Sequence, residues 1–512
     1  MDVKVCVLMF FMGMSISGII SAPCTQKTFY CNAIEDECVC QHLSCIPAGN
    51  PCVNLTRMNF EDSTFTTLPS DAFVNYTQLQ SIAILQQEDV VTIQENAFRN
   101  QHKLTNLYLQ FKGLLESNSF TGLHRLQTLS MTPGFSTIDS NTFNGLTASL
   151  IQLYLRRGML ADVKKDAFVQ LHNLTTLDLS SNRLTKVKSN WISSLSSLEI
   201  LYLKANQISS IEPDCFKHMT KLTNLDLSLN ALYTIPAQLF DGLISLTNID
   251  LSGNKITTIE EGAFKSQYSL TTLYFQYNKL STFSFADLYQ ENSTLSALLL
   301  NNNRMSSLVF PTYPSIPLRK LQYINLSYNR LRTFPTVVLN YYLPYLTTVY
   351  MHNNMLTCDC TMSNLTRYFT TFFGNVPNCT NSEKARCFAP SVYTNSSQVL
   401  TKLNSNVTLR CNFLGQPYPR VTWYGPKREP LIGQYNPFTG DTWLKLTNAE
   451  TTSLGKYKCT ATNPEGYNDS VITVVKHLEH EQTTNSASTF ISISLCYLIP
   501  WLMTIYTSTM HQ

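Results

Sequence analysis

The sequence predicts a solenoid of about thirteen repeats, with a curved parallel sheet on one side and an irregular convex side, followed by an all-β sandwich. Three observations favour this fold class. Apolar residues recur on a fixed spacing through the middle of the chain, clusters of cysteines flank that region, and a second pattern of Cys, Trp and Tyr follows it. The 512 residues are also too many for one compact core, so several modules are expected.

The repeat has the spacing L-x-x-L-x-L, in which other apolar residues can replace the leucines. Its steps are 22 to 26 residues and mostly 24. This period is typical of leucine-rich repeats, in which a short strand and a return segment stack as a curved solenoid, here over residues 55–357. The thirteen starts are Leu55, Leu79, Leu104, Leu126, Leu150, Leu174, Leu198, Leu222, Leu246, Leu270, Leu295, Leu321 and Leu346.

From the sixth repeat onwards the ninth position is an asparagine. Such an asparagine is expected to turn inward, where its amide can satisfy buried backbone groups at the end of the strand. The earlier repeats lack it, with Gln87 at the corresponding place in the second, so the N-terminal third is predicted to be less regular. The asparagines are Asn182, Asn206, Asn230, Asn254, Asn278, Asn303, Asn329 and Asn354.

Phenylalanines recur in phase on the return side and are expected to stack as an aromatic spine that closes the core. They are Phe73, Phe98, Phe120, Phe143, Phe168, Phe216, Phe240 and Phe264. Cys215 precedes one of them at a place where sibling repeats have alanine. It is therefore predicted to fill a small buried site as a free thiol, with a reactive or bridging cysteine as the alternative.

Cysteine clusters flank the repeats, where the exposed ends of a solenoid need caps. Each cluster has an even number of cysteines, which predicts disulfide bonds and an oxidising compartment, whereas no histidine pair stands at the spacing of a zinc site. The pairing within each cap stays open. The N-terminal cap, residues 23–54, holds Cys24, Cys31, Cys38, Cys40, Cys45 and Cys52, and the C-terminal cap, residues 358–389, holds Cys358, Cys360, Cys379 and Cys387.

The pattern after the repeats is that of an immunoglobulin domain. Cys411, Trp423 and Cys459 are spaced as the pin between two sheets, so a disulfide between the two cysteines is predicted. Tyr457 stands two residues before the second cysteine, at the place of the tyrosine corner. Ser453 stands where an aspartate is usual, which removes one salt bridge. The sequence therefore predicts an immunoglobulin-like sandwich over residues 390–476.

Both ends of the chain carry targeting patterns. Residues 1–22 have the pattern of a signal peptide, in which Lys4 precedes a short apolar stretch. A polar stalk over 477–488 leads to a hydrophobic segment, 489–512, that is expected to be an anchor or an anchor signal. The segment is short and no Lys or Arg follows it, which slightly favours a glycolipid-anchor signal over a spanning helix. Either alternative places the protein on the extracellular face of the plasma membrane.

Ten Asn-x-Ser/Thr sequons predict a glycosylated ectodomain. They begin at Asn54, Asn75, Asn173, Asn292, Asn325, Asn364, Asn378, Asn395, Asn406 and Asn468.

The sequence argues against an enzyme and against nucleic-acid binding. It contains no G-x-S-x-G, H-E-x-x-H or phosphate-loop pattern, so no catalytic, cofactor or metal site is predicted. His477 and His480 lie near glutamates, but in the polar stalk, where a solvated linker is the simpler interpretation. The formal charge of +3 is nearly balanced and no long basic run occurs, which does not favour DNA or RNA as partners.

The candidate binding surface is the concave side of the solenoid. Strand side chains alternate, so the residue between the second and third apolar positions of each repeat faces that side. Tyrosine supplies stiff contact area with a polar tip, and aspartate can meet a basic partner, although both can also be simply common at this position. The candidate protein-binding residues are Tyr154, Asp178, Tyr202, Asp226, Asp250 and Tyr274, with Tyr108 and Tyr350 further along the same column.

Two further features belong to this surface. The sequon of Asn325 falls in the same column, so a glycan there would obstruct the last repeats and leave the stretch from Tyr154 to Tyr274 open. The alternative is that this asparagine only replaces an aspartate and stays unmodified. A small basic cluster could bind an anionic glycan or form a solvated edge; it comprises Arg156, Arg157, Lys164 and Lys165.

With both modules placed, the chain resembles the leucine-rich repeat and immunoglobulin family of cell-surface proteins. In repeat number and single immunoglobulin domain it is most similar to the Nogo-receptor-associated members known as LINGO, although it lacks their basic cytoplasmic tail. The resemblance implies an adhesion molecule or co-receptor that binds an extracellular or membrane protein, with a homo-oligomer as a further option. The alternatives are an innate receptor for microbial lipid or glycan, and a shed protein that organises the matrix.

Overall fold

The computed structural model describes residues 30–34, 36–41, 43, 46, 52, 54–85, 90–146, 149–288, 293–310, 318–334, 343–357, 371–373, 387–416, 419–436, 440–463 and 465–477. The expected signal peptide and the hydrophobic C-terminal segment lie outside these residues. Within these residues, no helix combines the length and the apolar character that crossing a membrane requires.

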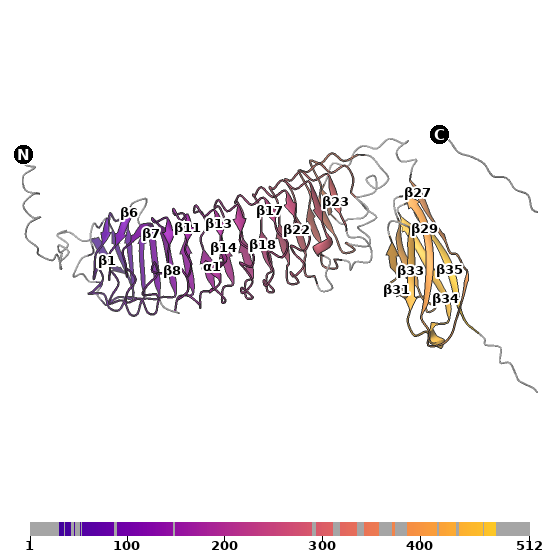
Figure 1. Cartoon of the computed structure of the whole chain (residues 1–512), viewed down its shortest axis with the longest axis horizontal. Helices are drawn as coiled ribbons and strands as arrows, with labels where there is room; N and C mark the ends of the chain where they lie inside the picture. Colours follow the sequence, from indigo (N-terminus) through magenta and orange to yellow (C-terminus); the bar gives the residue numbers. More distant parts are fainter. Residues whose placement is uncertain are drawn as a thin grey trace, which may run out of the picture.

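The repeats form one long parallel sheet along the solenoid (Figure 1). A strand begins two residues after each of the thirteen predicted starts, and the strands of consecutive repeats pair in parallel. The predicted fold class is confirmed. The strands are β3 (Arg57–Glu61), β5 (Ser81–Leu85), β7 (Asn106–Leu115), β8 (Thr128–Pro133), β10 (Gln152–Leu155), β12 (Thr176–Asp178), β14 (Ile200–Tyr202), β16 (Asn224–Asp226), β18 (Asn248–Asp250), β20 (Thr272–Tyr274), β22 (Ala297–Leu299), β24 (Tyr323–Asn325) and β25 (Thr348–Tyr350).

The return side is built from short pieces, which gives the irregular convex side that was predicted. Most of its strands pair in parallel twos, such as β9 with β11 and β13 with β15. The strands are β4 (Thr67–Leu68), β6 (Val90–Ile93), β9 (Thr137–Ile138), β11 (Asp162–Val163), β13 (Lys186–Val187), β15 (Ser210–Ile211), β17 (Thr234–Ile235), β19 (Thr258–Ile259), β21 (Thr282–Ser284) and β23 (Ser307–Val309). A one-turn helix, α1 (Ser189–Ile192), and a 3-10 turn, η1 (Ala286–Leu288), replace parts of this side.

The phenylalanine spine is present inside the solenoid. Phe73 stacks on Phe98 with ring centroids 5.4 Å apart, and Phe240 stacks on Phe264 at 5.3 Å. In the sixth repeat a tryptophan takes the place of the phenylalanine: Trp191, on α1, is buried and meets Phe168 edge-on at 6.0 Å. The rings therefore continue the packing of the leucines from one repeat to the next.

The asparagines turn inward as predicted and bond the backbone at the end of each strand. The Nδ2 atom of Asn230 donates to the carbonyl oxygens of Leu203 and Leu227, both at 3.0 Å, and to that of Ser228 at 3.1 Å. Its Oδ1 atom accepts the backbone N–H of Ile208 at 2.9 Å. One amide thus links its own repeat to the preceding one. Asn182, Asn206, Asn254, Asn278, Asn303, Asn329 and Asn354 bond in the same way.

The N-terminal repeats are less regular, as predicted. β7 runs for ten residues, and its register against β8 shifts between Leu109 and Lys112. It also pairs with β6, so a return strand joins the main sheet there. No asparagine turns the chain inward after the third apolar position, and the alternation of buried and exposed side chains continues through Phe111 towards the end of the strand. Gln87 lies outside the described residues.

The N-terminal cap extends the sheet beyond the first repeat. Its strands β1 (Tyr30–Ile34) and β2 (Glu37–Gln41) form an antiparallel hairpin, and β2 pairs in parallel with β3. Disulfides join Cys31 to Cys40 and Cys38 to Cys52, a pairing that the sequence left open. The sulfur atoms of Cys31, Cys38 and Cys40 lie within 4.8 Å of one another, but as disulfide sulfurs they offer no thiolate to a metal ion. Cys24 and Cys45 lie outside the described residues.

At the other end of the repeats, β26 (Thr371–Phe373) adds a further parallel strand to β25. Among the described residues of the C-terminal cap, β26 is the strand that joins this sheet. Cys387 is disulfide-bonded. Cys358, Cys360 and Cys379 lie outside the described residues.

The immunoglobulin-like domain is a sandwich of two sheets (Figure 1). One sheet has the order β27-β29-β33-β32 and the other β28-β35-β34-β30-β31. The strands are β27 (Phe388–Tyr393), β28 (Gln398–Thr401), β29 (Val407–Gln416), β30 (Arg420–Tyr424), β31 (Pro430–Leu431), β32 (Gln434–Asn436), β33 (Asp441–Leu446), β34 (Gly455–Asn463) and β35 (Gly466–Lys476), with a 3-10 turn, η3 (Thr451–Ser453), before β34.

The disulfide and the buried tryptophan that were predicted between the two sheets are present. A disulfide joins Cys411 on β29 to Cys459 on β34, and Trp423 is buried beside it. The hydroxyl of Tyr457 donates to the carbonyl oxygen of Ser453 at 3.0 Å, which is the tyrosine corner. The serine side chain accepts the backbone N–H of Glu450 at 3.2 Å, so it helps to close the turn where an aspartate is usual.

Cys215 is a buried free thiol, as predicted. Burial, followed by the negative charge of Glu212, raises the pKa of this thiol to about 12. Because the thiolate is the reactive form, we expect less than a few per cent labelling by iodoacetamide in the native protein at pH 8, and complete labelling after denaturation in urea. Peptide mass spectrometry of the two samples makes the measurement. Rapid labelling of the native protein would contradict the buried site and favour a reactive cysteine.

Candidate functional site

The candidate binding residues lie side by side across consecutive strands. In register, Tyr154 lies opposite Asp178, which lies opposite Tyr202. The line continues through Asp226 and Asp250 to Tyr274. The structure thus brings the six predicted residues together in one column, which we call the concave column. Tyr108 lies two strands before it, beyond Ser130, and Tyr350 lies three strands after it, beyond Leu299 and Asn325.

The aspartates of the column also have a structural role. Asp178 Oδ1 accepts the backbone N–H of Ser180 at 2.8 Å, and Asp250 Oδ1 accepts that of Ser252 at 2.8 Å. Asp226 bonds the residue two positions on in the same way. A carboxylate or amide at this place therefore holds the turn after the strand. This supports the alternative that aspartate is common at the position for reasons of its own.

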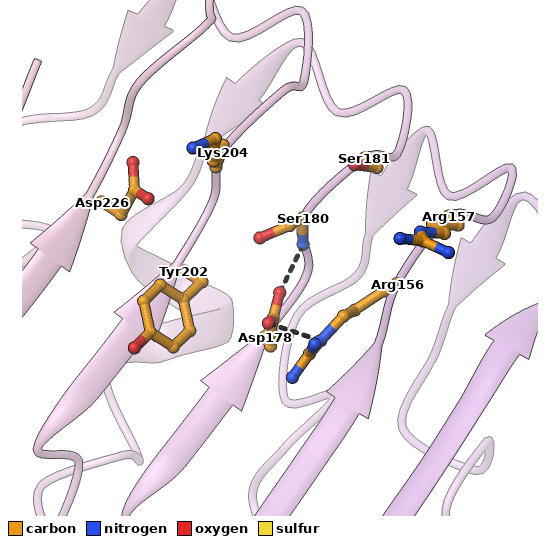
Figure 2. A pocket seen from close by; sticks show the side chains of 8 residues that line it. All are labelled: Arg156, Arg157, Asp178, Ser180, Ser181, Tyr202, Lys204 and Asp226. Atoms are coloured by element: carbon orange, nitrogen blue, oxygen red, sulfur yellow. Dashed lines mark hydrogen bonds and ion pairs between the residues drawn. The ribbon is translucent and has the colours of Figure 1, made fainter. Parts of the chain in front are cut away.

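A hollow lies beside the concave column, where β10, β12, β14 and β16 end (Figure 2). Its volume is ≈ 360 Å³. The eight lining residues are Arg156, Arg157, Asp178, Ser180, Ser181, Tyr202, Lys204 and Asp226. Ser180, Ser181 and Lys204 were not among the residues predicted from the sequence. A signal was available, because Arg156, Ser180 and Lys204 all follow the third apolar position of their repeats and so share one column.

One of the three cations in the hollow is held in place. The Nε atom of Arg156 lies 2.7 Å from Asp178 Oδ2, and its guanidinium lies over the ring of Tyr154, 4.5 Å from the centroid. The aspartate is buried, whereas about half of the arginine side chain is exposed (51%). Arg157 and Lys204, by contrast, make no ion pair with any residue that the structure describes. Their charges are available to a ligand.

The predicted basic cluster does not form one site. Arg156 and Arg157 line the hollow, but Lys164 follows β11 on the return side and, with Lys188, bonds Asp162 at 2.6 and 2.7 Å. Burial alone raises the pKa of this aspartate, but the hydrogen bonds from the two lysines outweigh it and hold the pKa below the ordinary value.

Lys165 lies 3.9 Å from Asp166. The two lysines that the sequence had grouped with the arginines therefore lie beside aspartates on the return side and not in the hollow.

The sequon of Asn325 lies on the concave side, between Leu299 and Tyr350 in register. Its Oδ1 atom accepts the backbone N–H of Ser327 at 3.1 Å and the serine hydroxyl at 2.7 Å, so it also holds the turn as the aspartates do. Other sequon asparagines are exposed, namely Asn54, Asn75, Asn173, Asn395, Asn406 and Asn468. Asn292, Asn364 and Asn378 lie outside the described residues.

Family profiles match both modules. The profile "Leucine rich repeat" matches residues 148–208, 196–256 and 244–305, and the profile "BspA type Leucine rich repeat region (6 copies)" matches 48–122. The profile "Immunoglobulin domain" matches residues 389–463.

Among curated proteins, the chain is similar to the human "Leucine-rich repeat, immunoglobulin-like domain and transmembrane domain-containing protein 3", with 36% identity over 98 residues. The mouse protein of the same name is 34% identical over 97 residues. Each match covers 18% of this chain and 14% of the relative.

Among solved structures, the leucine-rich repeat domain of APL1B is similar at 21% identity and a TM-score of 0.47, covering 61% of this chain and 86% of that one. The repeat and immunoglobulin matches, with the parallel solenoid and the disulfide-linked sandwich, show that the chain combines leucine-rich repeats with an immunoglobulin domain.

Proposed function

We propose that the protein is an adhesion molecule or co-receptor at the cell surface, which binds another protein through the concave face of its repeats. The observation that supports this most is the concave column, in which Tyr154, Tyr202 and Tyr274 stand in register along one rigid sheet. Tyrosines presented in this way give contact area at little cost in conformational entropy. The relatives named for a transmembrane domain are consistent with a membrane setting.

The immunoglobulin domain offers a second surface for a partner. It exposes single large apolar side chains, among them Ile432 at 86%, Tyr467 at 72% and Leu400 at 62%. These residues do not pack in its core, so they are available for contact, although scattered exposed apolar residues are normal on any surface. We therefore place the main contact on the concave column and an auxiliary contact on this domain.

Proximity labelling on intact cells tests this function. The full chain carries a biotinylating peroxidase inserted between the predicted signal peptide and the N-terminal cap, and biotinylated neighbours are identified by mass spectrometry. Recovery of particular membrane proteins, absent when the peroxidase is displayed on an unrelated anchor, is the expected result. Enrichment of matrix components would favour the shed structural protein, and binding of microbial lipid or glycan without protein neighbours would favour the innate receptor.

Substitutions in the concave column should weaken this labelling in a definite order. Tyr202→Ala combined with Asp226→Asn is expected to reduce affinity for the recovered partner at least about tenfold, because hot spots lie in the desolvated centre of an interface. The asparagine keeps an acceptor for the backbone N–H of Ser228, so the turn is retained.

Tyr350→Ala is the matched control at the end that a glycan on Asn325 would cover. Its expected effect is less than about threefold. Surface display titrated with the soluble partner gives both values. A larger loss for Tyr350→Ala would place the partner at the C-terminal repeats or on the immunoglobulin domain.

A further inference from the structure

We propose that the hollow beside the concave column binds a carboxylate of an acidic segment in the protein partner. The inference rests on the proposed function and names the chemistry of one contact within it. It is carried by the arrangement of charges and hydroxyls around the hollow (Figure 2).

The hollow is lined by three cations and two carboxylates, Asp178 and Asp226, and one of the cations is fixed while two make no ion pair with a described residue. Arg156 is oriented by its ion pair with Asp178 and by the ring of Tyr154. Arg157 and Lys204 line the same space without an ion pair among the described residues. Both are exposed, so neither has paid the desolvation cost that a buried charge carries. Strand β12 lies between the strands that precede these two residues, so a carboxylate that enters the hollow would form an ion pair with one of them and share the field of the other cations.

Neutral donors surround the same space. The hydroxyls of Ser180, Ser181 and Tyr202 make no hydrogen bond with any described residue. A carboxylate has about four acceptor positions and can take hydrogen bonds from hydroxyl, ammonium and guanidinium groups together. The backbone of Ser180 and Ser181 is itself held in place, because the N–H of Ser181 donates to the carbonyl oxygen of Lys204 at 2.8 Å. The donors are therefore presented by a backbone that needs little rearrangement.

The charges around the hollow favour a peptide over a sulfated glycan. A long sulfated chain carries charges along its whole length and needs a row of uncompensated cations, but the concave column continues with Asp226 and Asp250, which would repel the part that extends beyond the hollow. A short acidic segment need not extend that far. On the return side Lys164 and Lys188 share the single carboxylate of Asp162, which offsets one of their two charges. One carboxylate with apolar neighbours fits better, since tyrosine rings lie beside the hollow.

The test uses the purified full chain and a fluorescein-labelled penta-glutamate peptide, with penta-glutamine as the neutral peptide, in fluorescence anisotropy at low salt. The variant Arg157→Glu with Lys204→Glu is expected to bind penta-glutamate at least about tenfold more weakly and to gain binding of penta-lysine. Arg157→Gln with Lys204→Gln gives a milder change if charge reversal impairs folding.

The matched control is Lys186→Glu with Lys221→Glu, which makes the same change of charge at exposed positions outside the hollow. Equal losses in the two reversed pairs would overturn the proposal, because binding would then follow net charge alone. Tighter binding of a heparin hexasaccharide than of penta-glutamate, with the same dependence on the hollow, would also overturn it in favour of a glycan.

Failure of this inference can be told apart from failure of the proposed function. If a recovered partner still depends on Tyr202 but is indifferent to Arg157 and Lys204, the function stands and the carboxylate contact does not. If penta-glutamate binding depends on the hollow while no partner is labelled on cells, the carboxylate site stands and the proposed function fails.

Discussion

Replacing Asn230 by aspartate is expected to destabilise the solenoid by about 3 to 5 kcal/mol at neutral pH. The change keeps the size of the side chain and the acceptor for the backbone N–H of Ile208. It removes the amide that donates to three backbone carbonyl oxygens, two of them at 3.0 Å, and directs a carboxylate at them instead. A buried charge without a partner, facing acceptors, is among the most costly changes to a core.

The midpoint of unfolding in guanidinium chloride gives the measurement, with hydrogen exchange at the surrounding backbone locating the loss. Asn224→Asp is the matched control, since Asn224 lies on the half-buried concave side and accepts a hydrogen bond from Asn248 that aspartate can also accept. It should cost less than about 1 kcal/mol. Similar midpoints for the two variants would show that the inward amide contributes little.

The cost of the aspartate should depend on pH. Burial favours the neutral acid, so the carboxyl at this place would have a higher pKa folded than unfolded. The destabilisation is then small below the ordinary aspartate pKa and grows as the pH rises through it.

Removing the disulfide of the immunoglobulin domain is the second large change. Cys411→Ala with Cys459→Ala is expected to cost about 2 to 5 kcal/mol and to stop delivery of most of the protein to the cell surface. The bond closes a loop with a sequence separation of 48 residues and lies in the core with Trp423. Its loss gives back conformational freedom to the unfolded chain and leaves a small domain without the covalent link between its two sheets.

Flow cytometry of intact cells, compared with total expression, measures this loss. Cys215→Ala is the control, because it removes a buried cysteine that forms no disulfide and restores the alanine of the sibling repeats. Peptide mapping that finds Cys411 or Cys459 alkylatable in the native protein would contradict the prediction, as would normal surface levels of the double variant.

The repeat could be read from the sequence almost residue by residue, because each position has one physical task. The leucines fill the core, and an asparagine such as Asn230 satisfies the backbone where the strand ends. Those tasks recur every 24 residues, so phase alone places each side chain. The immunoglobulin domain was predictable for a similar reason, since Cys411, Trp423 and Cys459 mark its centre.

Other features could not be predicted, since they depend on contacts between repeats that no spacing records. The hollow needs Arg156, Ser180 and Lys204 from three repeats; their phase places them in one column, but it does not show that a hollow forms there. Trp191 fills the spine with a different residue type on a helical turn. The repeats before the sixth all lack the inward asparagine, yet among their strands β7 alone runs for ten residues, so the absence does not say where a strand will end. The cap disulfides depend on the hairpin of β1 and β2, which the cysteine spacing alone does not fix.

The inward amides also bear on how such a chain changes in evolution. Asn230 bonds groups of its own repeat and of the one before it, and Asn206 and Asn254 do the same one step away. Duplication or loss of one whole unit among the repeats that carry this asparagine would therefore leave each of their junctions with the same set of partners. Selection can lengthen or shorten the concave surface in steps of one repeat, and so adjust it to a partner of another size, without redesigning the interior.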